Sequence, residues 1–384
     1  MAGIYIHIPF CRKACHYCNF HFSTSKKLHQ AYVDALIKEI SLKKDKLKQL
    51  PAEGGFDKGI KSLYFGGGTP SQLPPDELKR ITDSLRCHFG WDNDIEFTLE
   101  ANPDDISAEV LNAWRDMGVN RLSLGIQSFK EKDLKYLGRQ HNAALAERAI
   151  NLARDTGYNN INIDLIYGIP EQTTKDWEEN LEMFISLNLQ HLSAYCLTVE
   201  PRTPLHVLIN KEKKNKPSEQ QAVRHFEILL KVAHANNMIH YEISNFCFEN
   251  YYSKHNLGYW QRKPYLGFGA SAHSFYAQMR SWNVANTSVY IKNIAEGNTF
   301  SEEEQLDEKT RYNEYVLTAL RTLWGCDMDY VKNIFDSRFY NYLVKQSGKY
   351  LEQGLLSNTN HFLVLTDKGK LFADGISADL FMVD

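Results

Sequence analysis

The chain has 384 residues, of which 43% are hydrophobic and 24% charged, and its formal net charge is −3. This length allows more than one domain, and the near-neutral charge gives no overall attraction to nucleic acid or acidic lipid. No apolar run reaches the ~18 residues that a membrane-spanning helix needs. The first residues lack the basic start and apolar core of a signal peptide, so we expect a cytoplasmic protein.

The N-terminal segment "GIYIHIP" alternates in the manner of a β-strand and leads directly into a loop rich in cysteine. That loop has a C-x3-C-x2-C arrangement, formed by Cys11, Cys15 and Cys18. In a chain without an export signal, three thiols this close indicate a metal or redox site rather than a disulfide framework. The remaining cysteines are scattered singly, and we expect them to be small buried hydrophobic residues: Cys87, Cys196, Cys247 and Cys326.

Two kinds of metal site remain open on spacing alone. A structural zinc ion would need a fourth ligand, which His16 or His21 would have to supply. Three thiolates on a cubane iron–sulfur cluster would instead leave one iron open to a substrate or cofactor. The spacing favours the cluster over zinc.

Strand and helix patterns alternate along the next part of the chain. Helical spacing occurs in residues 27–47, 74–89, 108–118, 142–157 and 174–188, and strand patterns occur within residues 60–73, 94–107, 119–129, 159–170 and 189–199. Repeated βα units of this kind form a parallel sheet with right-handed connections. About six units predict a partial barrel with its chemistry at the carboxyl ends of the strands.

The stretch "YFGGGTP" follows the second predicted strand. Backbone N–H groups of Gly67 and Gly68 could cradle an anion such as a carboxylate, with Thr69 beside them. A tight turn that requires positive φ is the simpler interpretation of three glycines alone. The stretch lacks the Lys of a P-loop.

Polar side chains close the next predicted strands. Glu100, Gln127 and Asp164 stand at three strand ends, and Arg139 follows a little beyond the second. Each alone is typical of a surface residue. Together they predict one polar rim, in which a carboxylate could hold a ribose hydroxyl or an ammonium group and the arginine could pair with a carboxylate.

A charge-rich break at residues 209–220 precedes the unusual segment "SKHNLGYWQRKPYLGFGASAHS". Imidazoles there, from His255 and His273, could ligate an iron porphyrin while Tyr259 and Trp260 stack on it. The alternative is a loop whose histidines and tryptophan pack against the barrel.

The last segment carries helical patterns over residues 302–335, followed by two strands round turns within residues 354–376 and a short terminal helix. Helices followed by a hairpin indicate a winged-helix-like domain. Residues 301–384 hold nine Lys and Arg against fourteen Asp and Glu, which argues against nucleic-acid binding. We therefore expect three parts, at residues 1–215, 216–300 and 301–384.

Taken together and in this order, "YIHIPFCRKACHYC", "GGGTP", "LEANPD", "LSLGIQSF" and "NIDLIYGIP" resemble radical S-adenosylmethionine proteins of the coproporphyrinogen III dehydrogenase (HemN) group. The resemblance runs from about Tyr5 to about His273. It implies an α/β fold, a partial (βα)6-type radical SAM barrel with a C-terminal winged-helix-like domain. It also implies a [4Fe-4S] cluster on Cys11, Cys15 and Cys18, whose open iron is chelated by S-adenosylmethionine. Reduction would then cleave that molecule to a 5′-deoxyadenosyl radical.

The same resemblance assigns cofactor-binding positions. It puts five residues at the cluster-bound S-adenosylmethionine: Tyr5, Gly67, Gly68, Thr69 and Glu100. It puts four more around the same cavity: Tyr17, Gln127, Arg139 and Asp164.

Two departures separate this chain from the dehydrogenase. Phe20 stands where that enzyme has a fourth cysteine, and "HNLGYW" fits the H-N-x-x-Y-W signature of the HemW family of haem chaperones. The resemblance thus implies haem binding and delivery to haem-dependent membrane or respiratory proteins without coproporphyrinogen oxidation, and it admits a homodimer. It makes His255 the candidate haem contact, with Tyr259 and Trp260 beside it. A radical enzyme, either the dehydrogenase or one with another substrate, is the alternative.

Overall fold

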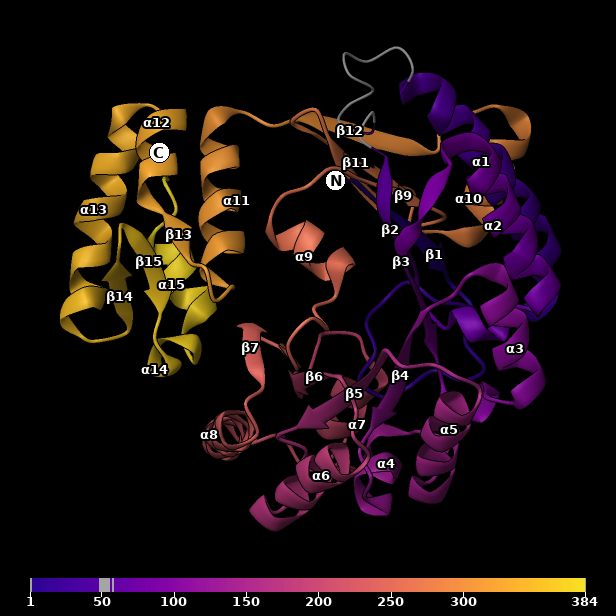
Figure 1. The fold of residues 1–384 in the computed structure, drawn as a ribbon, viewed down its shortest axis with the longest axis horizontal. Helices are drawn as coiled ribbons and strands as arrows, with labels where there is room; N and C mark the ends of the chain where they lie inside the picture. Colours follow the sequence, from indigo (N-terminus) through magenta and orange to yellow (C-terminus); the bar gives the residue numbers. More distant parts are fainter. Residues whose placement is uncertain (1, 48–55, 57–58, 384) are drawn as a thin grey trace.

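The computed structural model describes residues 2–47, 56 and 59–383 (Figure 1). Parallel strands alternate with helices in its first part, as the sequence predicts. These elements are β1 (Ala2–Ile8), α1 (His29–Leu47), β2 (Ile60–Gly67), α2 (Pro75–Phe89), β3 (Trp91–Ala101), α3 (Ala108–Met117), β4 (Arg121–Gln127), α4 (Glu131–Leu137), α5 (Ala143–Asp155), β5 (Ile161–Tyr167), α6 (Thr174–Ser186), β6 (His191–Cys196), α7 (Pro204–Asn210) and α8 (Glu219–Ala235). Short 3-10 helices lie at η1 (Lys26–Leu28), η3 (Pro70–Gln72) and η4 (Pro103–Asp105). This confirms the expected α/β partial barrel.

Local sequence explains where these helices begin and end. The Ser107 hydroxyl accepts a hydrogen bond from the Val110 N–H at the start of α3, and Gly118 ends that helix in the left-handed conformation. Thr173 and Asp176 form a reciprocal capping box at the start of α6. Such caps keep the connections short, so each helix returns the chain to the next parallel strand.

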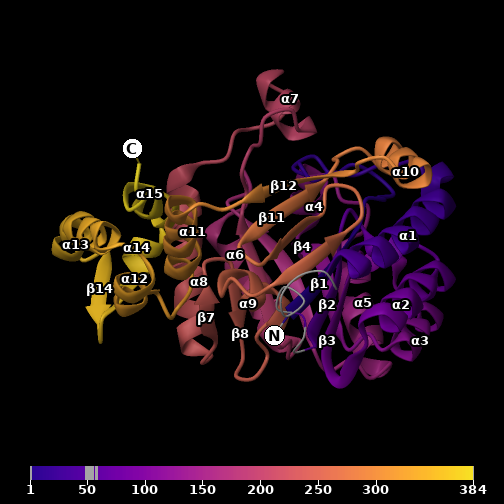
Figure 2. The same cartoon turned by 90° about the horizontal axis from the view of Figure 1, so that it is seen from above.

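The strands share one register at their carboxyl ends. Ile8 of β1 lies opposite Gly67 of β2, and Tyr167 of β5 lies opposite Cys196 of β6. Figures 1 and 2 show α1, α2, α3, α5 and α6 on the outer side of the curved sheet. All the loops that follow β1 to β6 therefore leave from the same rim.

Further strands extend the sheet at both edges. They come from β7 (Ile239–Glu242), β8 (Asn245–Cys247), α9 (Lys254–Trp260), β9 (Tyr265–Phe268), β10 (His273–Tyr276), β11 (Met279–Asn283), α10 (Thr287–Glu296) and β12 (Ser301–Gln305). In the described residues the strand order is β12-β11-β10-β9-β1-β2-β3-β4-β5-β6-β8-β7. Strand β9 pairs with β1 in parallel, whereas β10, β11 and β12 continue antiparallel.

The C-terminal unit has its own hydrophobic core and a small sheet of order β13-β15-β14. Its elements are α11 (Glu308–Leu320), β13 (Cys326–Asp327), α12 (Met328–Ile334), α13 (Ser337–Glu352), β14 (Leu356–Thr359), β15 (Phe362–Leu365), α14 (Asp367–Lys370) and α15 (Ala373–Asp379). The expected hairpin and short terminal helix are present.

Two sequence-based expectations were wrong. Residues 302–305 are not helical: they form most of β12, an edge strand of the large sheet whose charged side chains face solvent. Cys247 and Cys326 are buried as expected, but Cys87 and Cys196 are exposed. Cys87 lies on the outward face of α2, and Cys196 ends β6 at the rim. No helix among the described residues has the length and apolar character needed to span a membrane.

A buried carboxylate joins α1 to the strand extension beyond β1. Glu39 accepts hydrogen bonds from the Gly269 N–H at 2.8 Å, the Asn283 amide at 2.6 Å and the Tyr290 hydroxyl at 2.6 Å. It also forms an ion pair of 2.8 Å with Lys43. Both carboxylate oxygens are thus surrounded by donors in a site closed to solvent.

We expect Glu39→Gln to lower the free energy of unfolding by about 3–5 kcal/mol, the usual cost of removing one partner from a buried ion pair. An amide cannot accept at both positions, so its NH2 group would face other donors. Chemical denaturation followed by circular dichroism measures the loss. Glu182→Gln, on an exposed position of α6, is the matched control, and an equal effect of both substitutions would contradict the assigned role.

Candidate functional site

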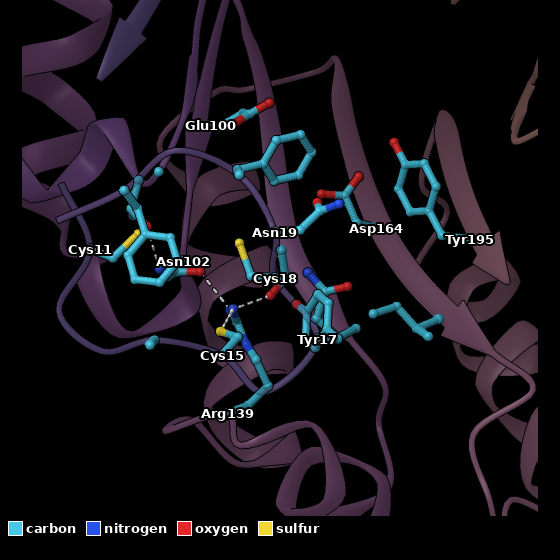
Figure 3. Close-up of a pocket in the computed structure, with 18 of the residues that line it drawn as sticks. Cys11, Cys15, Tyr17, Cys18, Asn19, Glu100, Asn102, Arg139, Asp164 and Tyr195 are labelled. Atoms are coloured by element: carbon cyan, nitrogen blue, oxygen red, sulfur yellow. Dashed lines mark hydrogen bonds between the residues drawn. The ribbon is translucent and has the colours of Figure 1, made fainter. Parts of the chain in front are cut away.

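A cavity of about 420 Å³ opens at the carboxyl ends of β1 to β6. Figure 3 shows its cysteines on one side and polar strand-end side chains around them. The structure brings together here nearly all the residues singled out in the sequence: Cys11, Cys15, Tyr17, Cys18, Gly67, Gly68, Thr69, Glu100, Gln127, Arg139 and Asp164. We call it the cysteine cavity.

The loop that carries the cysteines is fixed at several backbone positions. The Cys11 N–H donates to the Ser23 carbonyl at 2.9 Å, and the His16 N–H donates to the Leu137 carbonyl at 3.0 Å. The His16 ring is hydrogen-bonded through Nδ1 to the Tyr136 carbonyl at 2.9 Å. His16 therefore anchors the loop to the end of α4. A Cβ at Gly138 would lie 2.8 Å from the His16 ring, so this close approach requires glycine.

Each of the three thiols has a hydrogen-bond partner, and that of Cys18 is the backbone of Phe20. The Thr69 hydroxyl donates to Cys11 Sγ at 3.5 Å, and Arg139 Nη1 donates to Cys15 Sγ at 3.4 Å. Burial raises the pKa of Cys11 to about 11, with the neighbouring thiols adding to the rise and Arg139 opposing it. Burial likewise raises the pKa of Cys18.

The donor set of the cavity is three thiols, which are ligands of both iron–sulfur clusters and zinc. No group of three or more His, Cys, Asp or Glu side chains in the described residues is close enough to surround a single metal ion. A zinc ion would need all its ligands within ~2.3 Å of one point. In a cubane cluster each cysteine binds a different iron, so a cluster does not require the three thiols to converge on one atom.

A polar chain runs beneath the thiols from Arg139 to Thr69. Arg139 Nη2 donates to Asn102 Oδ1 at 2.5 Å and to the Gly125 carbonyl at 2.7 Å. The Asn102 amide in turn donates to the Thr69 hydroxyl at 3.3 Å. Figure 3 shows Arg139 between Cys15 and Asn102. Arg139 therefore serves as a support of the cysteine loop as well as a wall of the cavity.

The glycine loop is a tight turn and also lines the cavity. Gly67 has φ of 111°, and a Cβ there would lie 2.5 Å from the His7 ring. Its N–H donates to Glu100 Oε2 at 3.2 Å, while the Tyr64 hydroxyl donates to Glu100 Oε1 at 2.7 Å. Glu100 is thus held at the back of the cavity, where burial, with a smaller contribution from Asp164, raises its pKa to about 7.

The far wall contains a second carboxyl group and a strained strand end. Asp164 accepts a hydrogen bond from the Asn162 amide at 2.9 Å, and burial raises its pKa. Gln127 has φ of 69°, and the pairing of β4 with β5 shifts register just before it. This uncommon conformation for a non-glycine residue turns the end of β4 at the rim of the cavity.

Sequence reasoning missed several residues that line the cysteine cavity. They include Asn19, Asn102, Tyr195 and Cys196. Asn102 lies two residues after Glu100 in the same motif, and Tyr195 and Cys196 end β6. Had the strand-end rule been applied to the sixth strand, it would have found the latter pair.

One residue matched to S-adenosylmethionine lies elsewhere. Tyr5 lines a second cavity, and its hydroxyl is hydrogen-bonded to His7 Nδ1 at 3.1 Å. Its ring stacks on Tyr64 and His255, with centroids 6.1 Å and 6.3 Å away. Any role of Tyr5 at the cofactor stays a prediction.

The second cavity measures about 550 Å³ and lies where β9, β10 and β11 meet α9 and α11. Most of its walls are rings, so we call it the aromatic cavity. It is lined by Tyr5, His7, Phe20, His21, Tyr259, Trp260, Arg262, Tyr265, Ser271, His273, Phe275, Arg280, Glu314, Leu317 and Thr318. Tyr259 and Trp260 of the expected haem group are therefore here.

His255 does not reach the aromatic cavity. The segment around it is the helix α9, whose first N–H groups, those of Lys254 and His255, donate to the Glu96 carboxylate at 2.8 Å and 3.0 Å. The His255 ring is buried and hydrogen-bonded at both nitrogens, to Ser62 Oγ at 2.9 Å and to the Tyr259 hydroxyl at 2.8 Å. Burial lowers its pKa to about 3. The ring lines a separate cavity of about 270 Å³ near the start of β1.

Known proteins resemble this chain over its whole length. The model of the radical SAM superfamily matches residues 5–184, and that of the HemN C-terminal domain matches residues 306–372. A Bacillus subtilis protein named heme chaperone HemW is 34% identical over 98% of both chains. An Escherichia coli protein of the same name is 30% identical, over 100% of this chain and 98% of the other. The fold is that of the radical SAM enzyme coproporphyrinogen III oxidase (HemN) from Escherichia coli, with a TM-score of 0.84 and 24% identity over 99% of this chain and 90% of that one.

The raised pKa of Glu100 predicts a pH-dependent stability of the ligand-free protein. The folded state keeps the proton up to about pH 7, whereas an unfolded glutamate loses it near pH ~4.3. This group therefore lowers the free energy of unfolding as pH rises from about 4.5 to 7, by up to about 3 kcal/mol.

Glu100→Gln removes that titration, so its stability relative to the unsubstituted chain should increase over the same pH interval. Urea denaturation at several pH values from 5 to 8 measures the difference, with Glu182→Gln as control. A difference that does not change with pH would contradict the assigned burial of the charge.

Proposed function

Because the chain belongs to the HemW family of haem chaperones, we propose that it binds haem and transfers it to haem-requiring membrane or respiratory proteins. The sequence of the cysteine loop is the observation that favours a chaperone over the dehydrogenase. Three thiols line the cavity, but Phe20 stands where the dehydrogenase pattern continues with cysteine. Phe20 has no atom that binds a metal and is 66% exposed. We therefore propose a protein without coproporphyrinogen oxidation activity.

A [4Fe-4S] cluster and S-adenosylmethionine are part of the proposal. Cys11, Cys15 and Cys18 would hold the cluster, since soft thiolates select iron–sulfur centres and all three line the same cavity. The cluster supplies one-electron chemistry when it is bound. The protein supplies a cavity at the strand ends whose polar side chains, among them Glu100, Arg139 and Asp164, would position the cofactor.

The remaining walls suit a ligand with ammonium, carboxylate and ribose groups. Glu100 and Asp164 offer carboxylates for an ammonium group or ribose hydroxyls, and Arg139 offers a guanidinium for a carboxylate. Gly67, Gly68 and Thr69 form the glycine-loop wall, and Tyr17 and Gln127 complete the set. The volume of about 420 Å³ lies within the range of small-molecule sites.

The proposed place of action is the cytoplasm, with contact to the membrane through the client proteins. The formal charge of −3 for the chain provides no general attraction to acidic lipid, so we expect recognition of the client itself to bring the two together. A homodimer belongs to this proposal as well.

Haem binding and transfer by the anaerobically reconstituted protein tests the proposal. We expect the Soret band to show saturable binding of about one haem per chain, because the aromatic cavity offers both rings and imidazoles in a volume of about 550 Å³. Haem-loaded protein is then mixed with membranes that contain a haem-free b-type cytochrome, and the two are separated by sedimentation. The absorbance should move to the membrane fraction.

The control is bovine serum albumin loaded with haem at the same concentration, which reports passive release. Equal transfer from both would contradict a chaperone. Conversion of coproporphyrinogen together with release of 5′-deoxyadenosine would contradict the absence of oxidation activity.

A further inference from the structure

We propose that haem binds in the aromatic cavity, with His273 as the ligand of the iron and with Arg262 and Arg280 facing the propionates. This inference rests on the proposed haem-binding function and names its site. It differs from the sequence-based expectation, in which His255 contacts the haem.

The shape and lining of the aromatic cavity suit a flat macrocycle. Its volume is about 550 Å³, and β9, β10, β11, α9 and α11 form its walls. Tyr259 and Tyr265 pack edge to face with centroids 4.5 Å apart, and Phe275 continues the aromatic wall. Figure 1 shows α9 between the large sheet and the C-terminal unit. Ring faces in this position can stack on a porphyrin and shield it from water.

His273 offers both of its ring nitrogens to a metal. It is exposed, and neither ring nitrogen has a hydrogen-bond partner among the described residues. Its nearest ring contact is Trp282, at 6.3 Å between centroids. Partial burial of the ring and the nearby Arg280 lower the pKa of His273, which favours the neutral imidazole that iron requires.

Each of the other two histidines of the cavity uses at least one ring nitrogen in a hydrogen bond. His7 is hydrogen-bonded at Nδ1 to the Tyr5 hydroxyl and at Nε2 to the His21 carbonyl, at 3.1 Å and 3.0 Å. His21 uses Nε2 for the Thr287 hydroxyl at 3.0 Å. Binding iron through His7 would break an existing hydrogen bond, whereas His273 would lose none.

The charge of the cavity matches a ligand with two carboxylates. Arg262 and Arg280 both contact Glu314, the first through Nη2 at 3.6 Å, so two guanidinium groups share one carboxylate there. Arg280 also lies 4.0 Å from Glu304 at the open edge. Burial, together with the nearby Arg311 and Arg280, lowers the pKa of Arg262. Guanidinium groups form strong charge-assisted hydrogen bonds with carboxylates.

His255 is then a positioning residue. Its Nε2 holds the Tyr259 hydroxyl at 2.8 Å and its Nδ1 holds Ser62, so it fixes the Tyr259 ring that lines the cavity. Removing it would loosen the wall and weaken haem binding without removing the iron ligand. We therefore expect the His273→Ala and His255→Ala variants to have different haem spectra.

Phe20 borders both the cysteine cavity and the aromatic cavity. It lies two residues after Cys18 and is largely exposed. A haem in the aromatic cavity would contact this ring, which places the haem directly beside the cysteine loop.

The test is a haem titration of four anaerobically reconstituted proteins, namely the unsubstituted chain, His273→Ala, His255→Ala and His234→Ala. His234 lies on α8 with its side chain 61% exposed and outside both cavities, so it is the matched control. Absorption and resonance Raman spectra report the axial ligand. We expect His273→Ala to lose the imidazole signature and His255→Ala to keep it with weaker binding.

Imidazole added to His273→Ala should restore the original spectrum, an outcome that a purely structural role would not produce. Arg280→Gln should weaken haem binding by about ten- to a hundredfold. Haem dimethyl ester, in which both propionates are esterified, should bind the unsubstituted chain at least ten- to a hundredfold more weakly than haem does. The difference in affinity between haem and its ester should be smaller for Arg280→Gln than for the unsubstituted chain.

The possible failures are distinct. If the unsubstituted chain shows no saturable haem binding, the proposed function itself is overturned. If it binds haem while His273→Ala retains the spectrum and affinity of the control, the site assignment is overturned and the chaperone proposal stands. Loss of the imidazole signature in His255→Ala alone would make His255 the iron ligand, and this result would also overturn the site assignment.

Discussion

Both cavities depend on the hydrogen bonding of β1 along its two edges. Strand β1 pairs in parallel with β2 from Ala2 to Ile8 and with β9 from Gly3 to Ile6. It therefore joins the parallel barrel to the extension β9 to β12, and its carboxyl end releases the cysteine loop between the two halves. Because one strand sets both registers, a slip by one residue would reverse its faces and disturb both cavities together.

Several features of the cysteine cavity are unfavourable for the stability of the folded protein. Glu100 and Asp164 lie in a poorly solvated interior that raises both pKa values. Gln127 adopts positive φ, and Gly67 admits the His7 ring where a side chain could not fit. Such unfavourable local choices concentrate where ligands bind. The aromatic cavity contains similar features, since Ser271 in its wall also has positive φ and burial lowers the pKa of Arg262.

Much of this could be predicted from the sequence, because the signals are local. Alternating and helical periods identified the βα units, and the rule that parallel strands end at one rim brought Glu100, Gln127 and Asp164 together with the cysteines. The positions of His255 and Tyr5 could not be predicted, because they depend on tertiary contacts. The buried hydrogen bonds of His255 depend on its pairing with Ser62, a residue 193 positions away. The position of Tyr5 depends on the pairing of β1 with β9, which no local pattern encodes.

The open iron implied by three cysteines is tested most directly by electron paramagnetic resonance. The protein is reconstituted anaerobically, reduced, and measured with and without S-adenosylmethionine. If Cys11, Cys15 and Cys18 hold the cluster, we expect about four irons per chain. We also expect the spectrum to change when S-adenosylmethionine binds the fourth iron. An unchanged spectrum, or stoichiometric zinc after reconstitution with both metals, would contradict the cluster and its open coordination position.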